Sequence, residues 1–511
     1  MGNDPTSKIR SIDALGDIAR AARAQGKTVV LAHGTFDLMH FGHVRHLQAA
    51  RNEGDVLIVT VTADGFVNKG PGRPVFTHGI RAEMLASLES VDYVGINEEP
   101  TSEGVLRTVR PDVYVKGSDY ANAEDDVTGK INDEQAVVKS YGGRTVFTDE
   151  VTFSSSSLIN RHLDIYDPPL REFLNRLRDS DGLRTMSELL ERVRDFKVLM
   201  VGDTIVDEYQ YVIPMGRSPK ENMIATLFQN RELFAGGVIA AANHAASFCR
   251  EVEVLTALGS VDGHRDLVAE SLKPNVSLCS IERDGMPTTR KCRFVDQSYL
   301  RKLFEVYHMD DAPLRGEEEA RFIAALRERA STADVVIVTD FGHGLITPRV
   351  IQALAECSPF LAVNAQSNSA NTGFNLITRY PRADYICIDA PEARLAAADK
   401  YADISHIISE LLPARVDCDR TIITNGRHGC VTRGPGEPLI HIPAFTRTVV
   451  DTVGAGDAFF AITAPLVAAG ASLAHAGFIG NVAGALKVNI VGHRKSVEKS
   501  AVLKYLQTLL K

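Results

Sequence analysis

Short β-branched runs alternate with helix-like segments in two series along the chain, and this alternation is its strongest constraint on fold. The first series contains TVVLAH, VLIVTVT, DYVGI and DVYVK. The second contains KVLMVGD, VEVLTALG, DVVIVTDFGHG, FLAVNA, YICID and TIITNG. Strands that alternate with helices form parallel sheets covered by helices on both faces. The sequence therefore predicts an α/β protein with two doubly wound, Rossmann-like domains.

A break in the pattern separates the two series. Pro168 and Pro169 interrupt it, and a charged, helix-favouring segment follows. The 511 residues also exceed what one hydrophobic core usually holds. We expect one domain over residues 1–165, a helical connector over 166–194 and a second domain over 195–511. Within the second domain, MIATLFQNRELF and CRFVDQSYLRKLFEVY have no helix-like segment between their strands, which predicts a small antiparallel β flap.

Composition narrows the class of protein. Apolar residues make up 44% and charged residues 24%, as in ordinary globular proteins. The net charge of −9 argues against a nucleic-acid-binding protein. The N-terminus lacks the apolar core of a signal peptide, and no apolar run is long enough to span a membrane. The seven cysteines lack CxxC spacing, which is typical of reduced thiols. We expect a cytoplasmic enzyme without nucleic-acid or membrane partners.

The stretch GTFDLMHFGH, residues 34–43, forms the first candidate site. It follows a predicted strand, so a helix beginning at Gly42 or His43 would direct its backbone N–H groups and dipole at a ligand. Gly42 would let a phosphate approach the backbone. His40 and His43 would donate hydrogen bonds to oxygens that gain charge in the transition state. With Mg²⁺, such a site suffices for displacement at a phosphate.

Other basic and polar residues extend this site. Lys69 and Arg73 lie on a glycine-rich loop, from which they would reach a triphosphate or a sugar phosphate. The segment after DVYV lies at the carboxyl edge of the predicted sheet, where ligands of open α/β sheets collect. The serines of SSSSLINR offer hydroxyls at a helix start.

Over residues 25–162 the chain resembles the cytidylyltransferase-like nucleotidyltransferases, whose signature is HxGH. The stretches RPVFTHGIRAEMLASLESVDYV and RPDVYVKGSDY resemble the adenylyltransferase part of the bifunctional ADP-heptose synthases, and SSSSLINR matches their serine/threonine-rich motif. In that family a sugar-phosphate oxygen attacks the nucleotide α-phosphate and pyrophosphate leaves. The resemblance implies catalytic roles for His40, His43 and Lys69. It also implies nucleotide contacts from Gly34, Thr35, Phe36, Gly42, Lys116, Gly117, Asp119, Ser154, Ser155 and Ser156, and substrate contacts from Asp37, Arg73 and Arg81.

The stretch DTVGAGDAFF, residues 451–460, forms the second candidate site. Gly454, Ala455 and Gly456 form a loop before an apolar helix, which predicts an anion hole of backbone N–H groups. Asp457, in the first turn of that helix, would accept the proton of an attacking hydroxyl. We therefore expect Asp457 to be the catalytic base.

Residues 195–500 resemble the ribokinase/PfkB sugar kinases. The motifs VGDTIVDEY, FAGG, TDFGHG and TNGRHG carry the resemblance. They imply substrate contacts from Asp207, Gly236 and Gly237, and nucleotide contacts from Thr424, Gly426, Gly429 and the loop 454–456.

The motifs also depart from the PfkB pattern in three places. The family's Asn after the glycine pair falls on Ala240, with Asn243 nearby as a substitute substrate contact, and its Asp-Pro-Lys is replaced by NAQSN. Its NxxE motif is DAPE, which keeps Glu392 as a ligand for Mg²⁺. We interpret these departures as a changed substrate.

Together the halves indicate a bifunctional enzyme that phosphorylates a sugar with ATP and transfers a nucleotide from ATP to a sugar 1-phosphate. The products would be an ADP-heptose-like sugar for surface lipopolysaccharide, and pyrophosphate. The familiar enzymes carry the kinase first, so we expect a reversed domain order here. We also expect a homodimer, with the flap as a contact. Two alternatives remain open: a kinase-like half that only binds a ligand or regulates, and an N-terminal half that uses CTP with a polyol phosphate. VKGSDY and RPV favour ATP.

Overall fold

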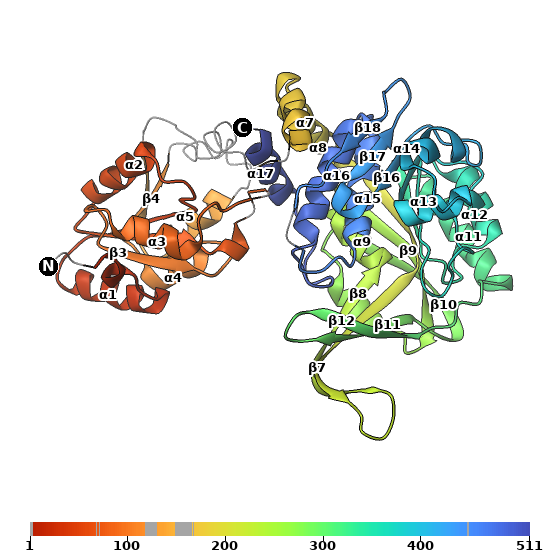
Figure 1. Cartoon of the computed structure of the whole chain (residues 1–511), viewed down its shortest axis with the longest axis horizontal. Coiled ribbons are helices and arrows are strands. Elements are labelled where there is room, and N and C mark those ends of the chain that lie inside the picture. Colours follow the sequence, from red (N-terminus) through yellow and green to blue (C-terminus); the bar gives the residue numbers. More distant parts are fainter. Residues whose placement is uncertain are drawn as a thin grey trace. The chain divides into compact units, whose positions relative to one another are not determined.

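The computed structural model describes residues 4–67, 69–70, 72–117, 130–148, 166, 168–446 and 449–510. The chain divides into two compact units (Figure 1). Unit 1 contains residues 1–178 and 503–511, and unit 2 contains residues 179–502. Both are α/β, which confirms the predicted fold class. The domain boundaries expected at residues 165 and 194 stay predictions.

Unit 1 contains a five-stranded parallel sheet in the order β3-β2-β1-β4-β5. Its strands are β1 (Val29–Gly34), β2 (Val56–Thr62), β3 (Tyr93–Asn97), β4 (Val113–Gly117) and β5 (Arg144–Thr148). Its helices are α1 (Ile12–Ala24), α2 (Phe41–Asn52), α3 (His78–Ala86), α4 (Glu103–Val109) and α5 (Lys130–Ser140). The strand order reverses at β1 and β4, and the carboxyl ends of the strands at such a switch point form the usual ligand crevice.

The side chains of β1 show why this sheet is covered on both faces. Val30 and Ala32 pack in one core cluster with Leu47 of α2 and Leu85 of α3. Val29 and Leu31 pack in a second cluster, with Leu15 of α1 and Leu106 of α4. Successive side chains of a strand point to opposite faces, so one continuous apolar run serves two cores.

Unit 2 contains a nine-stranded sheet in the order β10-β9-β6-β13-β14-β15-β16-β17-β18. It is parallel from β10 to β16 and antiparallel at β17 and β18. Its strands are β6 (Lys197–Gly202), β9 (Glu251–Val261), β10 (Val276–Pro287), β13 (Val335–Asp340), β14 (Leu361–Ala365), β15 (Tyr385–Asp389), β16 (Thr421–Thr424), β17 (Cys430–Arg433) and β18 (Ile440–Ile442).

The helices that follow α5 are α7 (Pro168–Asp179), α8 (Gly182–Arg192), α9 (Val238–Ala246), α10 (Arg265–Ser271), α11 (Gly316–Ala330), α12 (Pro348–Cys357), α13 (Ala390–Ala397), α14 (Ile404–His406), α15 (Ala455–Ala468), α16 (Leu473–Lys487) and α17 (Lys499–Leu510). Helices α15 and α16 pack against each other, and most of their residues are buried. The apolar helix expected after the loop 454–456 is therefore a core helix.

A second sheet of unit 2 forms the flap, in the order β12-β11-β7-β8. Its strands are β7 (Thr204–Arg217), β8 (Ile224–Gly237), β11 (Thr289–Asp296) and β12 (Arg301–His308), and the β7–β8 hairpin extends away from the main sheet (Figure 1). The sheet is mixed rather than antiparallel, because β7 and β11 pair in parallel. Each of these two strands continues directly from a parallel strand of the main sheet, β6 and β10, which explains their common direction.

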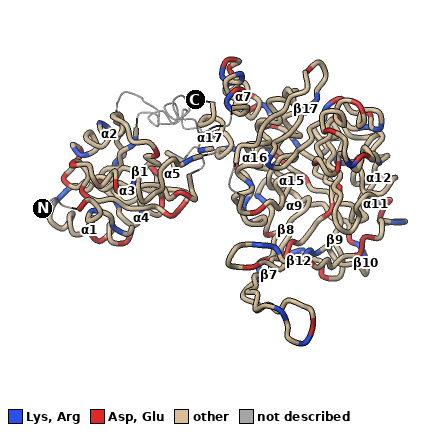
Figure 2. Tube along the Cα trace, viewed as in Figure 1, with Lys and Arg blue, Asp and Glu red and all other residues tan. Residues whose placement is uncertain are grey.

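Charged residues are distributed without large areas of one sign. Figure 2 shows Lys and Arg interspersed with Asp and Glu along each unit. Among the residues that the structure describes, none of the helices has the length and apolar character needed to span a bilayer.

Candidate active sites

The two histidines of HxGH lie at the start of α2, close to the end of β1. The helix begins at Phe41 with His40 as its N-cap, one residue before the earliest expected start. His40 Nδ1 accepts a hydrogen bond from the Gly42 N–H at 3.1 Å, and His43 Nδ1 accepts one from the His40 N–H at 3.3 Å. Since each Nδ1 accepts, the ring hydrogen of each neutral imidazole lies on Nε2. The two rings, 4.0 Å apart, thus supply two Nε2–H donors.

The protonation state of these rings follows from their burial. Desolvation, together with the nearby His40, His46 and Lys69, lowers the pKa of His43 to about 3. Burial also lowers the pKa of His40. Both rings are therefore neutral at pH 7 and serve as hydrogen-bond donors without a full charge. The Gly42 N–H was expected to be directed at a ligand. It instead donates to the His40 ring, which caps the helix.

Phe36 supports the histidine pair from the core. Its backbone has a left-handed φ of 48°, and its buried ring lies edge-on to His43 at 5.4 Å. A Cβ on Gly34 would lie 3.1 Å from the Phe36 ring, so glycine leaves room for it. The Thr35 carbonyl accepts a hydrogen bond from Arg81. Gly34, Thr35 and Phe36 shape the turn, and their nucleotide contacts stay predictions.

Arg81 corrects a second expectation. The side chain is fully buried in α3 and donates to the carbonyls of Phe76 at 2.9 Å, Thr62 at 2.8 Å and Thr35. It also pairs with Asp64. These partners use the donors of the guanidinium inside the protein, so Arg81 joins the ends of β1 and β2 and does not face a substrate.

Asp37 and Arg73 form a buried ion pair with 3.4 Å between Oδ2 and the guanidinium. Asp37 Oδ1 also accepts the backbone N–H of Val75 at 2.6 Å and of Phe76 at 3.4 Å. Neither side chain is exposed. The pair holds the loop that follows Lys69, and the expected substrate contacts of Asp37 and Arg73 stay predictions.

Lys116 and Gly117 end β4, beside the end of β1. The Lys116 ammonium pairs with Glu134 at 2.9 Å, and Glu134 also accepts hydrogen bonds from Ser102 and Tyr114. Among the described residues, and apart from the chain neighbours of Gly117, no atom lies within 4 Å of the position that a Cβ there would take. The β1–β4 switch point thus combines a paired cation with an open glycine. Asp119, Ser154, Ser155 and Ser156 lie outside the described residues.

The second site centres on the first turn of α15. Gly454, with φ of 73°, caps the helix, and Ala455 begins it. The Ala455 N–H donates to the Thr452 carbonyl at 3.2 Å, so it is not open to a ligand as expected for the anion hole. Asp457 is buried and accepts a hydrogen bond from Gln366 Nε2 at 2.6 Å. Burial raises the pKa of Asp457, while His493, Gln366 and Lys487 oppose this rise.

Asp207 on β7 faces the guanidinium of Arg293 and the imidazole of His493. It pairs with Arg293 of β11, and its Oδ2 lies 3.2 Å from His493 Nε2. Despite burial, these partners hold the pKa of Asp207 well below its usual range. The Asp207 carboxylate thus anchors His493 and Arg293, and its expected sugar contact stays a prediction.

The glycine pair at the end of β8 lies against this carboxylate. A Cβ on Gly236 would clash with Asp207 Oδ2 at 2.0 Å. Gly237 has φ of 58°, and a Cβ there would clash with the Asp203 carbonyl. Close packing therefore requires glycine at both positions. The structure brings Gly236 and Asp207 together beside His493.

Asp451 and Lys487 hold the loop before α15. Asp451 opens the stretch DTVGAGDAFF but had no predicted role, and Lys487 lies outside the motifs. Asp451 accepts hydrogen bonds from Tyr209, from Lys302, and from the N–H groups of Val453 and Gly492. The buried Lys487 donates to the carbonyls of Val453 at 2.7 Å and Gly492 at 2.8 Å. These bonds join the loop 451–456 to the turn that carries His493.

Asn243 also differs from its expected role. Its Nδ2 donates to the Ser271 carbonyl at 2.7 Å, and its Oδ1 accepts the Lys273 N–H at 3.0 Å. The side chain therefore ties α9 to the end of α10 and does not replace the family's sugar-contacting Asn.

The nucleotide-side turn follows β16, which ends at Thr424. Gly426 and Gly429 have φ of 51° and 85°, and a Cβ on Gly429 would lie 1.9 Å from the Ile442 carbonyl. Both glycines are thus needed for the turn itself. The nucleotide contacts of Thr424, Gly426, Gly429 and Gly456 stay predictions.

Glu392 lies at the start of α13 in a capping box with Asp389. Its oxygens accept the Asp389 N–H at 2.9 Å and the Ser367 N–H at 3.1 Å. Burial and the adjacent Asp389 raise the pKa of Glu392 to about 8. Across the described ranges, no three His, Cys, Asp or Glu side chains converge into a metal-binding group. Glu392 and Asp389 offer only two carboxylates. They fit Mg²⁺ only if the ion takes most of its ligands from phosphates and water.

Comparison with known families decides the class of unit 2. The profile of the pfkB family carbohydrate kinases matches residues 195–500, more than half of the chain. The chain belongs to the pfkB family. A second profile, cytidylyltransferase-like, matches residues 31–161, so a nucleotidyltransferase-like domain precedes the pfkB domain.

Curated relatives match the nucleotidyltransferase-like part. "Bifunctional protein HldE" of Syntrophotalea carbinolica is 42% identical over 164 residues, which is 32% of this chain and 32% of that protein. "Bifunctional protein HldE" of Methylobacillus flagellatus is 44% identical over 158 residues, 30% of this chain and 31% of that protein. The chain thus spans about a third of the length of these relatives. Nothing in these matches supports the reversed domain order expected above.

Solved structures agree with the fold of the pfkB domain. Phosphofructokinase-2 from Escherichia coli, in complex with substrates and products, has a TM-score of 0.51 and 14% identity. The match covers 62% of this chain and 100% of that one. At this identity the likeness shows the ribokinase-like fold alone.

A buried carboxyl in the pfkB domain predicts a pH effect on stability. Asp203 accepts the Phe341 N–H at 3.1 Å, and burial together with Asp340 raises its pKa to about 7. An unfolded aspartate has a pKa of about 3.9. The stability that the neutral carboxyl provides is therefore lost as pH rises from about 4 through 7. We expect the urea midpoint to fall less between pH 4.5 and 8 in Asp203→Asn than in the wild type; equal falls would contradict this.

Proposed function

We propose that the protein is a bifunctional enzyme of nucleotide-sugar biosynthesis. Unit 1 would transfer the adenylyl group of ATP to a sugar 1-phosphate, and the pfkB domain would phosphorylate a heptose-phosphate-like sugar with ATP. The observation that carries the first activity is the pair of Nε2–H donors of His40 and His43 beside the β1–β4 switch point. Membership of the pfkB family supports the second. We place both reactions in the cytoplasm.

The geometry of unit 1 supports displacement at a phosphate. An acceptor phosphate oxygen would attack the α-phosphorus of ATP, and the bond to the leaving pyrophosphate would break. The Nε2–H groups of His40 and His43 would donate to oxygens whose negative charge grows in this step. Lys69, close enough to His43 to lower its pKa, would supply positive charge to the same phosphates.

The geometry of the pfkB domain supports proton removal by a buried carboxylate. Asp457 would accept the proton of the acceptor hydroxyl as that oxygen attacks the γ-phosphorus of ATP. Glu392 and Asp389 would hold Mg²⁺ together with the nucleotide phosphates. When bound, the ion would neutralise charge on those phosphates.

A two-part assay on the full chain tests the proposal. Pyrophosphate release would be measured with ATP and CTP side by side, each with a panel of sugar 1-phosphates and polyol phosphates. Phosphate transfer from labelled ATP would be measured with a panel of sugars and sugar phosphates. We expect activity with ATP in both parts. Pyrophosphate release with CTP alone would assign unit 1 to the polyol-phosphate branch.

The second candidate is a nucleotidyltransferase whose pfkB domain only binds a ligand. Two observations favour this alternative. Asn243 binds backbone groups of Ser271 and Lys273, and NAQSN at residues 364–368 replaces the family's Asp-Pro-Lys. Absence of phosphate transfer from ATP to every acceptor in the panel would support this alternative.

We also propose that the chain forms a homodimer through the flap. The flap exposes apolar side chains; Ile224 and Phe228 of β8 are 66% and 55% exposed, and Phe304 of β12 is 52% exposed. Large exposed apolar areas mark association surfaces. We expect Phe228→Asp to shift the protein toward the monomer mass in sedimentation or light scattering. A wild type that is already monomeric at micromolar concentration would contradict the dimer.

A further inference from the structure

Gln366 lies between Asp457 and a group of buried polar side chains around Asp340 in the pfkB domain. It directly follows β14, and its backbone is fixed on both sides. The Gln366 N–H donates to the Asp340 carbonyl at 2.8 Å, and its carbonyl accepts Asn375 Nδ2 at 3.1 Å. The side chain then donates to Asp457 Oδ1 at 2.6 Å. The main chain of Gln366 is thus held independently of the contact that its amide makes.

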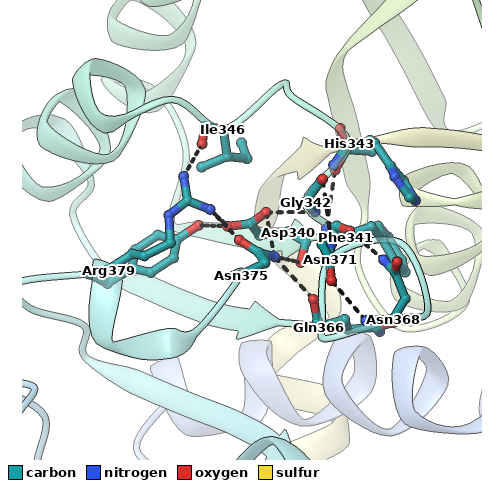
Figure 3. A network of polar contacts seen from close by, with 12 residues as sticks. Asp340, Phe341, Gly342, His343, Ile346, Gln366, Asn368, Asn371, Asn375 and Arg379 are labelled. Atoms are coloured by element: carbon teal, nitrogen blue, oxygen red, sulfur yellow. Dashed lines mark hydrogen bonds and ion pairs between the residues drawn. The ribbon is translucent and has the colours of Figure 1, made fainter. Parts of the chain in front are cut away.

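The support behind Gln366 is a network of polar contacts (Figure 3). Asp340 is fully buried and accepts the Gly342 N–H at 3.0 Å, Asn375 Nδ2 at 3.1 Å and the Tyr380 hydroxyl at 2.9 Å. Arg379 pairs with Asp340 and donates to Asn375 Oδ1 (Figure 3). Buried networks whose polar groups are satisfied are rigid. The network therefore fixes the loop from which Gln366 reaches Asp457.

We propose that Gln366 is a positioning residue for Asp457: its amide holds Oδ1, which turns Oδ2 toward the acceptor hydroxyl. The inference rests on the proposed kinase activity. Among the described residues, no other side chain donates a hydrogen bond to Asp457. The residue type also suits this role, because an amide N–H stabilises the ionised carboxylate that a base requires without carrying a charge itself.

The charged surroundings of Asp457 predict how the contact acts. His493, Lys487 and Asp207 influence its carboxyl, and Asp457 in turn influences Glu392 and Cys387. Burial raises the pKa of Asp457, and the Gln366 hydrogen bond lowers it. Removing the amide leaves the other groups in place and raises the pKa of Asp457. The variant therefore needs a higher pH than the wild type to ionise the base.

The first test compares the pH profile of the kinase reaction in Gln366→Ala and wild type. We expect kcat/KM to fall at least ~10-fold at pH 6 but less than threefold at pH 9, with the acidic limb shifted to higher pH. Gln352→Ala is the matched control, since Gln352 donates to the Glu356 carboxylate at 2.9 Å on the surface. A fall that is equal at all pH values, or no fall, would overturn the proposal.

The second test does not need kinase activity. Since removing Gln366 raises the folded-state pKa of Asp457, the variant loses more stability than the wild type as pH rises. We expect the difference in urea midpoint between wild type and Gln366→Ala to grow from pH 5 to pH 8. That growth should vanish in an Asp457→Asn background, which has no carboxyl to titrate. A constant difference, or growth that persists in that background, refutes the role of Gln366. A wild type without kinase activity would instead refute the proposed function.

Discussion

Replacement of His43 by alanine is expected to reduce nucleotidyl transfer at least ~100-fold, the usual scale for loss of one preorganised charge-stabilising donor. The variant loses the Nε2–H donor of His43 and also the Nδ1 acceptor that fixes the His40 N–H. Pyrophosphate release at saturating ATP measures the effect. Phosphate transfer by the pfkB domain should remain at the wild-type rate, because the two sites lie in separate compact units.

His43→Gln is the matched comparison for this variant. Its amide retains one donor and one acceptor, so part of the lost rate should return. The melting temperatures of both variants should be measured beside the rates, since His43 packs against Phe36. A rate for His43→Ala within a few-fold of the wild type would contradict the assignment of the histidine pair.

Replacement of Asp457 by asparagine is expected to reduce phosphate transfer by ~100-fold to ~10,000-fold, the range for loss of a general base. Asparagine has nearly the same shape and keeps an oxygen that can accept the hydrogen bond from Gln366. The fold should therefore survive while the ability to accept a proton is lost. Single-turnover transfer from labelled ATP measures the change, and nucleotidyl transfer should be unaffected.

Two other outcomes for Asp457→Asn are informative. Loss of both activities would show that the two units are energetically coupled. Equal, near-zero phosphate transfer in the wild type and the variant would favour a pfkB domain that only binds its ligand. Lys499 provides a surface control, because it pairs with Glu191 within unit 2, and Lys499→Ala should leave both rates unchanged.

Local pattern was sufficient to predict much of the fold. The apolar runs became parallel strands because each serves cores on both faces, as β1 shows with Val29, Val30, Leu31 and Ala32. The flap was predicted from strands without intervening helices, but its mixed pairing was not. Whether β7 and β11 run in parallel depends on the direction in which each strand leaves the main sheet. That direction cannot be predicted from the residues of the strand itself.

Site residues were harder to predict, because residue type does not reveal the direction in which a side chain points. Arg81 and Asn243 have the chemistry of ligand contacts, yet their polar groups are used by backbone partners. His493 and Lys487 lie outside every motif, and Asp451 lies in DTVGAGDAFF without a predicted role. Their roles depend on contacts between segments far apart in the chain, such as Asp451 with Tyr209 and Lys302.

The grouping of residues 503–511 with unit 1 affects how the halves can be produced separately. Leu509 and Tyr505 approach Gly70, and the Leu509 carbonyl accepts a hydrogen bond from Arg178. A gene fragment that stops near residue 165 would omit these partners and leave apolar surface open to aggregation. A recombinant unit 1 would therefore have to carry residues 166–178 and 503–511 as well.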